Sequence, residues 1–387
     1  MRLVLIVLLL AACAPIGAVQ TPGAAGEHLS PTPLSAAASV TSPIPAAPPS
    51  SPPGIPSNRQ PTIAPLPPTS VPTLLATLPP ALQPVKPSTP SSSEQISAAR
   101  LRADLLVLQA YHTRHSASAS GLSAGEIGSA RAWLIDQLRG ISPRLQVVTD
   151  SFVFPFGNRP TAAQNIIATL PGRVNPPQVI IISAHYDSRT VDIADVRSAA
   201  PGANDDGSGV AAVLELARAL SPQSLDATFK FILFAGEEEG LFGSRHLAPV
   251  MRKDGVRIIA MLNNDIIGNV TGSDGQRVDN RVRIFSGDPD GGPSRQLAAE
   301  AKTIVERALP GFGVELVAAL DRAGRGGDQI AFHYAGYPAI RFIEAVENLE
   351  HQHGPNDRVE FMDMAYLANV VRANLAVALE LGQLVGG

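Results

Sequence analysis

The sequence predicts an α/β fold, a three-layer αβα sandwich around a mixed, mostly parallel central sheet. The apolar run at residues 179–182 has the length and β-branching of a strand buried on both faces of a parallel sheet. Val210, Val213 and Ala217 follow it at helical spacing. Strand and helix patterns then alternate along the chain, which argues for helices on both faces of the sheet.

The N-terminal residues have the pattern of a bacterial secretion signal. Residues 1–12, MRLVLIVLLLAA, combine one positive charge, a short apolar core and small residues, and are too short to span a bilayer. The run from Leu10 to Cys13 resembles the lipobox of bacterial lipoproteins, in which the cysteine is exposed by cleavage and acylated. We therefore expect lipidation at Cys13 and an extracytoplasmic protein, lipid-anchored to the bacterial cell membrane or secreted. The alternative is that Cys13 is only a small apolar residue of the signal.

A linker is expected over residues 13–91, where Pro, Ser, Thr and Ala dominate and charge is almost absent. Such a segment cannot bury enough apolar surface to offset the entropy of ordering, and its prolines favour extended polyproline II. It is interpreted either as a stalk that holds a domain away from a membrane or as a passive disordered tether.

We expect the remaining chain to form one domain over residues 92–387. Its composition excludes some classes of partner and of stabilisation. The net charge of −4 provides no basic field, so nucleic acid is excluded as a partner. The single cysteine excludes a disulfide framework. Stability must therefore come from a hydrophobic core or from bound metal.

Two helices and two strands are expected before the central run. Ser93 or a neighbour can cap a helix, and a second helix around Leu134 is expected to end at Gly140. Between them, residues 121–125 satisfy the G-x-S-x-G pattern of serine hydrolases. No apolar strand precedes this segment, so we reject that motif. Strands are expected at residues 146–154 and 165–170.

Polar residues follow each of the next strands at its C-terminal end, where ligands bind in open α/β sheets. His185 and Asp187 follow the first, and Asp205 precedes a helix that Ser208 can cap. Acidic runs are usually solvated, but Glu237 and Glu238 stand at a strand end between glycines. Two further apolar runs, residues 256–262 and 338–343, precede Asp265 and a loop that contains His353, and a helix over about 364–381 ends the domain.

These strand ends together predict a metal centre. Two imidazoles with three carboxylates suit zinc. Two divalent cations are balanced by three carboxylates and one hydroxide, whereas a single ion would be over-neutralised. Asp205 is the natural bridge between two ions. The candidate ligands are His185, Asp205, Glu238, Asp265 and His353.

Five motifs resemble the aminopeptidase Y and aminopeptidase S type of co-catalytic dizinc peptidases, peptidase family M28. They are HYD at 185–187, GANDDGSG at 202–209, FAGEEEGLFGS at 234–244, LNNDIIG at 262–268 and HGPND at 353–357. The resemblance extends from about Ser92 to the end of the chain and implies the zinc-peptidase, phosphorylase/hydrolase-like fold.

The resemblance also implies a role for each site residue. It implies two Zn²⁺, one held by His185 and Asp265, the other by Glu238 and His353, and both by Asp205. Asp187 would orient the His185 imidazole. Glu237 would be the general base that activates a zinc-bridging hydroxide. The expected substrates are peptide or protein N-termini, whose ammonium the remaining acidic surround can hold.

The chain departs from the family pattern at two points. Residues 327–329 read Gly-Asp-Gln where many relatives have Ser-Asp-His, and Gln352 stands where some members have an oxyanion-supporting Tyr. His353 is preferred over His351 as a ligand, and Asp206 is expected to support its loop. The other histidines are interpreted as linker, surface or ordinary helix residues, namely His28, His112, His115, His246 and His333.

Three alternatives to the aminopeptidase remain open at this stage. Glutaminyl cyclases share the fold, but lack the ligand that His185 provides here. Non-catalytic binding modules on this fold usually lose ligands, whereas this chain keeps them. A carboxypeptidase would need a guanidinium such as Arg325 or Arg341 to hold a C-terminal carboxylate.

Overall fold

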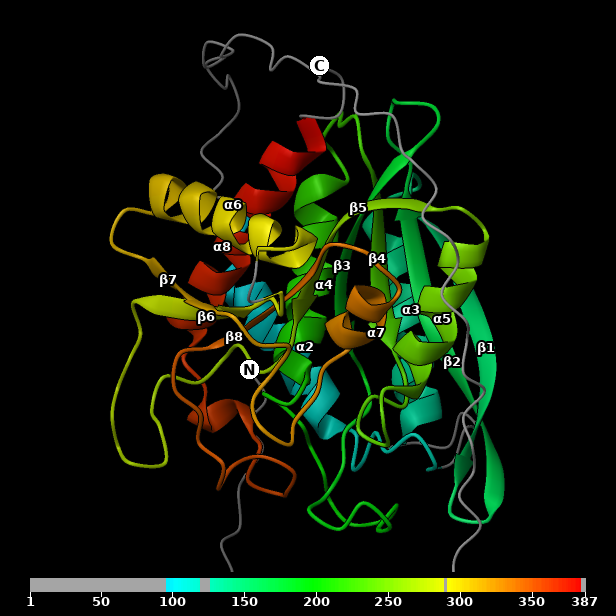
Figure 1. Cartoon of the computed structure of the whole chain (residues 1–387). Coiled ribbons are helices and arrows are strands. Elements are labelled where there is room, and N and C mark those ends of the chain that lie inside the picture. The colour runs from blue at the N-terminus through cyan, green and yellow to red at the C-terminus, as the bar shows by residue number, and fades with distance from the viewer. Residues whose placement is uncertain (1–94, 119–125, 289–290, 384–387) are drawn as a thin grey trace, which may run out of the picture. The chain divides into compact units, whose positions relative to one another are not determined.

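The structure, a computed structural model, describes residues 95–118, 126–288 and 291–383 (Figure 1). The strands are β1 (Gln146–Phe156), β2 (Arg159–Leu170), β3 (Gln178–His185), β4 (Thr228–Phe234), β5 (Arg257–Asn264), β6 (Arg281–Phe285), β7 (Gly313–Val317) and β8 (Ala339–Glu344). The helices are α2 (Ala98–Ala110), α3 (Ile127–Ile141), α4 (Gly207–Leu220), α5 (Phe242–Lys253), α6 (Pro293–Ala308), α7 (Gln329–Tyr334) and α8 (Met364–Gln383), with a 3₁₀ turn η1 (Val359–Phe361).

The described strands form one sheet in the order β1-β2-β4-β3-β5-β8-β6-β7. The four central strands, β4, β3, β5 and β8, are mutually parallel. The β1–β2 hairpin continues the sheet antiparallel to β4, and β6 pairs antiparallel with β8. The sheet is therefore mixed, with a parallel centre, as predicted. Parallel strands place their carboxyl ends at one edge, so this arrangement brings the ends of β3, β4, β5 and β8 together.

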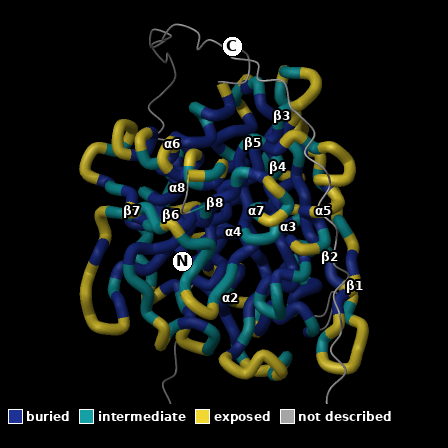
Figure 2. The backbone as a smooth tube through the Cα atoms, viewed as in Figure 1, coloured by how far each residue is buried: buried dark blue, intermediate teal, exposed yellow. Residues whose placement is uncertain are grey.

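Side chains of successive β3 residues point to opposite faces of the sheet and supply two separate cores. Ile180 and Ile182 belong to the larger core, which includes residues of α2, α3, α4, α6 and α8. Val179 and Ile181 belong to the smaller core, with residues of α5 and α7. Helices thus cover both faces, the central strands are buried, and the predicted three-layer sandwich is confirmed (Figures 1 and 2).

Helix α8 is long and apolar enough by composition to cross a membrane, yet 61% of its most apolar stretch is buried. It packs against α4 and α6, and Leu367, Val371 and Leu375 are fully buried in the larger core. Its apolar character is therefore explained by its place inside the domain.

The predicted helix ends differ in detail from the observed ones. Ser97 caps α2, because its hydroxyl accepts a hydrogen bond from the backbone N–H of Arg100. Helix α3 continues through Gly140 to Ile141. The cap of α4 is Asp206 rather than Ser208, whose hydroxyl instead donates to the backbone oxygen of Asn204.

Several elements were not predicted from the sequence, namely β6, β7, α5, α6 and α7. Other expectations lie outside the described residues and stay predictions. They are the signal at 1–12, lipidation of Cys13, the linker at 13–91, the cap at Ser93 and the rejected motif at 121–125.

Candidate metal centre

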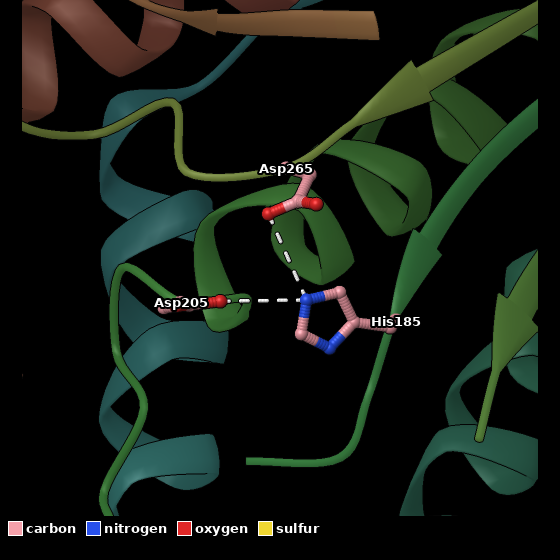
Figure 3. Close-up of side chains that lie close together, drawn as sticks. All are labelled: His185, Asp205 and Asp265. Atoms are coloured by element: carbon pink, nitrogen blue, oxygen red, sulfur yellow. Dashed lines mark ion pairs between the residues drawn. The ribbon is translucent and has the colours of Figure 1, made fainter. Parts of the chain in front are cut away.

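The first group of possible metal ligands is formed by His185, Asp205 and Asp265 (Figure 3). Nε2 of His185 lies 3.4 Å from Oδ1 of Asp205 and 3.7 Å from Oδ1 of Asp265. His185 is the last residue of β3, Asp265 follows β5, and Asp205 precedes α4. All three side chains are buried. The first group is therefore built by the ends of two adjacent strands and one helix.

The second group consists of Asp205, Glu238 and His353. Nε2 of His353 lies 3.0 Å from Oδ2 of Asp205 and 3.4 Å from Oε2 of Glu238. Glu238 stands in the turn after β4, and His353 in the loop after β8. Asp205 turns one oxygen toward each imidazole, so the two groups share this carboxylate. The structure thus brings together all five residues that the sequence predicted as ligands.

Asp206 holds the strand ends in place rather than joining either group. Its carboxylate caps α4 by accepting from the N–H of Gly209. It also accepts from the backbone N–H groups of His185, at the end of β3, and Ile266, beyond the end of β5. A side chain at Gly209 would place Cβ 2.2 Å from the backbone oxygen of Asn264, so only glycine allows this close approach.

Two further carboxylates, which were not predicted as functional from the sequence, support the loop that carries Asp205. Asp357 accepts from the backbone N–H groups of Asn204 at 2.7 Å and Asp205 at 2.8 Å. Glu344, the last residue of β8, accepts from the side-chain amide of Asn204 and the N–H of Asn269. Both are buried. The sequence shows only that Glu344 ends an apolar run and that Asp357 ends the HGPND motif. It does not show which residues they contact, because those residues are distant in sequence.

Asp187 and Glu237 lie beside the two groups. Oδ1 of Asp187 is 3.5 Å from Nδ1 of His185, the nitrogen that faces away from Asp205. Its other oxygen accepts from the backbone N–H of Glu238. Oε2 of Glu237 lies 3.8 Å from Nε2 of His185. Asp187 is thus close enough to orient the His185 imidazole. Glu237 lies beside the first group without belonging to it, a position that suits a general base.

The electrostatics of the site follow from acids and imidazoles in a buried space. Burial lowers the pKa of His353, but Asp205 and Glu238 outweigh burial and raise it to about 9. Burial raises the pKa of the Glu237 carboxyl well above its usual value, and the carboxylates of Asp265 and Glu238 add to the shift. The pKa values of His353 and Glu237 are therefore both raised, the first by neighbouring carboxylates and the second by burial.

Two buried carboxylate oxygens without a hydrogen-bond partner indicate whether a cation would fit the site. Oδ1 of Asp265 and Oε1 of Glu238 are buried and accept no hydrogen bond from any residue that the structure describes. A buried carboxylate oxygen without a partner is costly unless a cation or proton satisfies it. One carboxylate of each group thus has an unpartnered oxygen. Oδ1 of Asp265 lies 3.7 Å from Nε2 of His185, whereas the oxygen of Glu238 near His353 is its other one, Oε2. The donor set of nitrogen and carboxylate oxygen fits zinc.

The metal groups open into a cavity of about 290 Å³. Arg341 lines it but is buried and paired with Oδ2 of Asp265 at 3.0 Å and with Asp321 at 2.5 Å. Arg341 therefore positions the Asp265 carboxylate. Arg325 also lines the cavity, and its guanidinium donates to Oε1 of Gln352.

The two glutamines at which the chain departs from the family pattern, Gln329 and Gln352, both form hydrogen bonds within the protein. Gln329 stands in the place of the expected histidine and hydrogen-bonds Asn263 and the backbone oxygen of Leu320. Asp328 is buried, and burial raises its pKa to about 7. Gln352 accepts from Arg325, so the amide is occupied within the protein.

One histidine lies in an environment that differs from its prediction. His115 is neither a surface nor a helix residue, because its side chain is buried in a loop with Nδ1 3.1 Å from Oε1 of Glu239. Its other nitrogen contacts the backbone oxygen of Ile193. The acidic run after β4 therefore has three different environments, which spacing alone cannot reveal. His351 packs its ring on Phe361 instead of reaching the metal groups.

The remaining described histidines lie outside both metal groups. His112 contacts the backbone oxygen of Arg197, and His333 contacts the hydroxyl of Ser294. His246 lies 3.3 Å from Asp150. His28 lies outside the described residues.

Comparisons with known proteins match the region that builds this site. A family model described as "Peptidase family M28" matches residues 165–378. A "Probable zinc metalloprotease" of Leptosphaeria maculans is 36% identical over 327 residues, which cover 76% of this chain and 76% of that protein. The matched family region contains every member of both metal groups.

Solved structures show the same fold. BSAP, a zinc aminopeptidase from Bacillus subtilis, is 18% identical with a TM-score of 0.60, covering 76% of this chain and 97% of that one. The glutaminyl cyclase of Porphyromonas gingivalis is 18% identical with a TM-score of 0.60, covering 74% and 99%. At these identities the solved structures establish only the architecture.

Proposed function

The chain belongs to peptidase family M28 and is a zinc metallopeptidase, and from this premise we propose that it is an exopeptidase that removes residues from peptide N-termini. The observation that carries the proposal is the pair of ligand groups sharing Asp205 at the floor of an open cavity, with Glu237 beside them. The likeness in fold to a solved zinc aminopeptidase supports the choice of the N-terminus.

Two zinc ions are proposed, one for each group. His185 and Asp265 would hold one ion, Glu238 and His353 the other, and Asp205 would bridge them. The unpartnered oxygens of Asp265 and Glu238 support this assignment. When bound, the ions would supply Lewis-acid polarisation of the scissile carbonyl and a lowered pKa for a bound water molecule.

The protein's own groups would direct the reaction. Asp187 would keep Nδ1 of His185 protonated, so that Nε2 presents its lone pair to the ion. Glu237 would accept the proton of the attacking water on its carboxylate and later deliver it to the leaving amine. Its place outside both groups leaves it available for this proton transfer.

The location of the enzyme is a separate proposal. The signal-like residues 1–12 and the lipobox support export and acylation at Cys13. Residues 13–91 would then connect the lipid anchor to the peptidase domain. Treatment of cells with an inhibitor of lipoprotein maturation, followed by membrane fractionation, tests this part independently of catalysis.

The experiment for the activity is a substrate panel with metal analysis. The full chain is tested on aminoacyl p-nitroanilides, on the same compounds with blocked N-termini, and on N-blocked peptides that only a carboxypeptidase can shorten. Zinc is counted by mass spectrometry. Release from free N-termini alone, with about two zinc ions per chain, is expected. Cleavage of N-blocked peptides from the C-terminus would overturn the aminopeptidase assignment.

A further inference from the structure

We propose that Arg325, assisted by Arg245, binds a carboxylate group of the substrate beside the metal centre. This inference rests on the proposed exopeptidase function and adds a substrate class to it. It assigns the cavity a preference for peptides that carry a negative charge near the bond to be cleaved.

Both acidic and basic side chains line the cavity beside the metal groups. Its described acidic lining residues all belong to the metal groups or to the proposed base, namely Asp205, Glu237, Glu238 and Asp265. Its basic lining residues are Arg189, Arg245, Arg322, Arg325 and Arg341. With metal ions bound to Asp205, Glu238 and Asp265, Glu237 is the one acidic side chain of the described lining that stays outside the metal groups. The sequence-based expectation of a further acidic surround for a substrate ammonium is therefore wrong for the described lining.

Three of these arginines are already paired within the protein. Arg341 pairs with Asp265 and Asp321, as described above. Arg322 pairs with Asp321 and Glu347. Arg189 donates to Oε2 of Glu238 at 2.7 Å. These three arginines therefore position carboxylates of the protein.

Arg325 and Arg245 are different, because neither has an ion-pair partner among the residues that the structure describes. Arg245 is exposed on α5. Arg325 is partly buried in the loop before α7, and one of its nitrogens donates to Gln352 at 3.1 Å. Gln352 directly precedes His353. This hydrogen bond therefore orients a guanidinium next to the second metal group while leaving donors free for a carboxylate.

The position of Arg325 is also favourable for contact with a substrate. A second cavity of about 460 Å³ is lined by Arg322 and Arg325 together with Val346 and Leu349. Because both cavities share the two arginines, Arg325 stands at their boundary. A peptide that continues beyond the cleaved bond into the second cavity would pass this guanidinium. Leu349, 58% exposed, offers an apolar contact there.

The carboxylate can come from three parts of a peptide, and matched substrates separate them. Leu-Ala with a free C-terminus is compared with Leu-Ala-amide. Glu-Ala-amide is compared with Gln-Ala-amide, and Leu-Glu-amide with Leu-Gln-amide. In at least one pair, the zinc-loaded protein should hydrolyse the charged member about 10- to 100-fold more efficiently, the range expected for a charge-assisted hydrogen bond. The pair that shows this preference identifies the source.

Variants link that preference to the two arginines. Arg325→Gln should remove most of the preference, through a raised KM for the charged member of the pair. Arg325→Lys should restore part of it, and Arg245→Gln should have a smaller effect. The matched control is Arg139→Gln, an exposed arginine on α3. Equal preference in every pair, or a preference that survives in Arg325→Gln, overturns the proposal.

A binding measurement separates this inference from the proposed function. The Glu237→Gln protein is titrated with each pair of peptides by calorimetry, which requires no turnover. Tighter binding of a charged peptide that depends on Arg325 supports the inference even if no peptide is cleaved. In that outcome the proposed exopeptidase function fails alone. Absence of any charge-dependent binding overturns the carboxylate site.

Discussion

The two metal groups share Asp205 but are built from different kinds of structure. His185 and Asp265 stand at the ends of adjacent parallel strands, and the side chain of His185 is 1% exposed. Glu238 and His353 come from a turn and a long loop, and the side chain of His353 is 10% exposed. The first group is held by the sheet, whereas the second depends on loop contacts.

This difference assigns different tasks to the two groups. The hydrogen-bonded register of β3 and β5 determines where the first group lies, with Asp206 tying both strand ends to α4. Both groups line the cavity that contains Arg325, and the histidine of the second group has a positive φ of 54°. We infer that the sheet-held group is the rigid reference and that the loop-held group is the one linked to Arg325, through Gln352 next to His353.

The largest effect is expected from a change that breaks both groups at once. Asp205→Asn removes the shared anionic bridge, so the protein should lose zinc from both groups and its activity should become undetectable. Metal analysis after gel filtration measures the loss. The exposed Asp136→Asn on α3 is the control. Retention of two ions by Asp205→Asn would contradict the shared-ligand arrangement.

A change outside both groups should leave them intact. Glu237→Gln keeps the shape of the side chain but removes its ability to accept a proton. We expect full zinc content with kcat reduced about 10²- to 10⁴-fold. Glu300→Gln on α6 is the matched control. If Glu237→Gln retains wild-type kcat, another group is the base.

A third change should separate the groups. Asp187→Asn weakens the contact to Nδ1 of His185, while its amide oxygen still accepts from the N–H of Glu238. Zinc affinity of the sheet-held group should fall about 10- to 100-fold, and the loop-held group should be nearly unaffected. Competition with a fluorescent chelator resolves the two affinities. Equal weakening of both sites would show that the groups are not independent.

The smallest effect concerns pH and the loop-held group. The metal-free protein has a pKa of about 9 for His353, above the ordinary histidine value. This protonated histidine stabilises the metal-free fold fully below about pH 6.5 and loses its contribution as pH rises through about 9. Zinc must displace the proton, so zinc affinity should increase over the same window.

Thermal unfolding without zinc, and zinc binding at controlled free concentrations, measure these opposite trends. The metal-free protein should melt at a lower temperature toward pH 9, while its zinc affinity rises. His353→Gln should release fewer protons on zinc binding. Proton release equal to that of the wild type would show that His353 does not titrate with the metal.

Much of the site could be predicted because its residues follow strands of recognisable composition. His185, Glu238 and Asp265 each stand at or just beyond the end of an apolar run, and parallel strands end at one edge. Asp357 and Glu344 escaped prediction, because their role is to accept hydrogen bonds from residues 75 to 153 positions away. Local patterns carry no information about such partners.

The sequence by itself determined the fold class, the mostly parallel character of the central sheet and the residues at its strand ends, because hydrophobic periodicity and motif spacing are local properties. Only the tertiary structure decided which arginines are free to meet a substrate. Both Arg341 and Arg325 line the cavity and both could be candidates from the sequence, but Arg341 is buried and paired with Asp265 and Asp321, whereas Arg325 has no ion-pair partner among the described residues. Pairing depends on which side chains folding brings within ion-pair distance, and that is a property of three-dimensional packing.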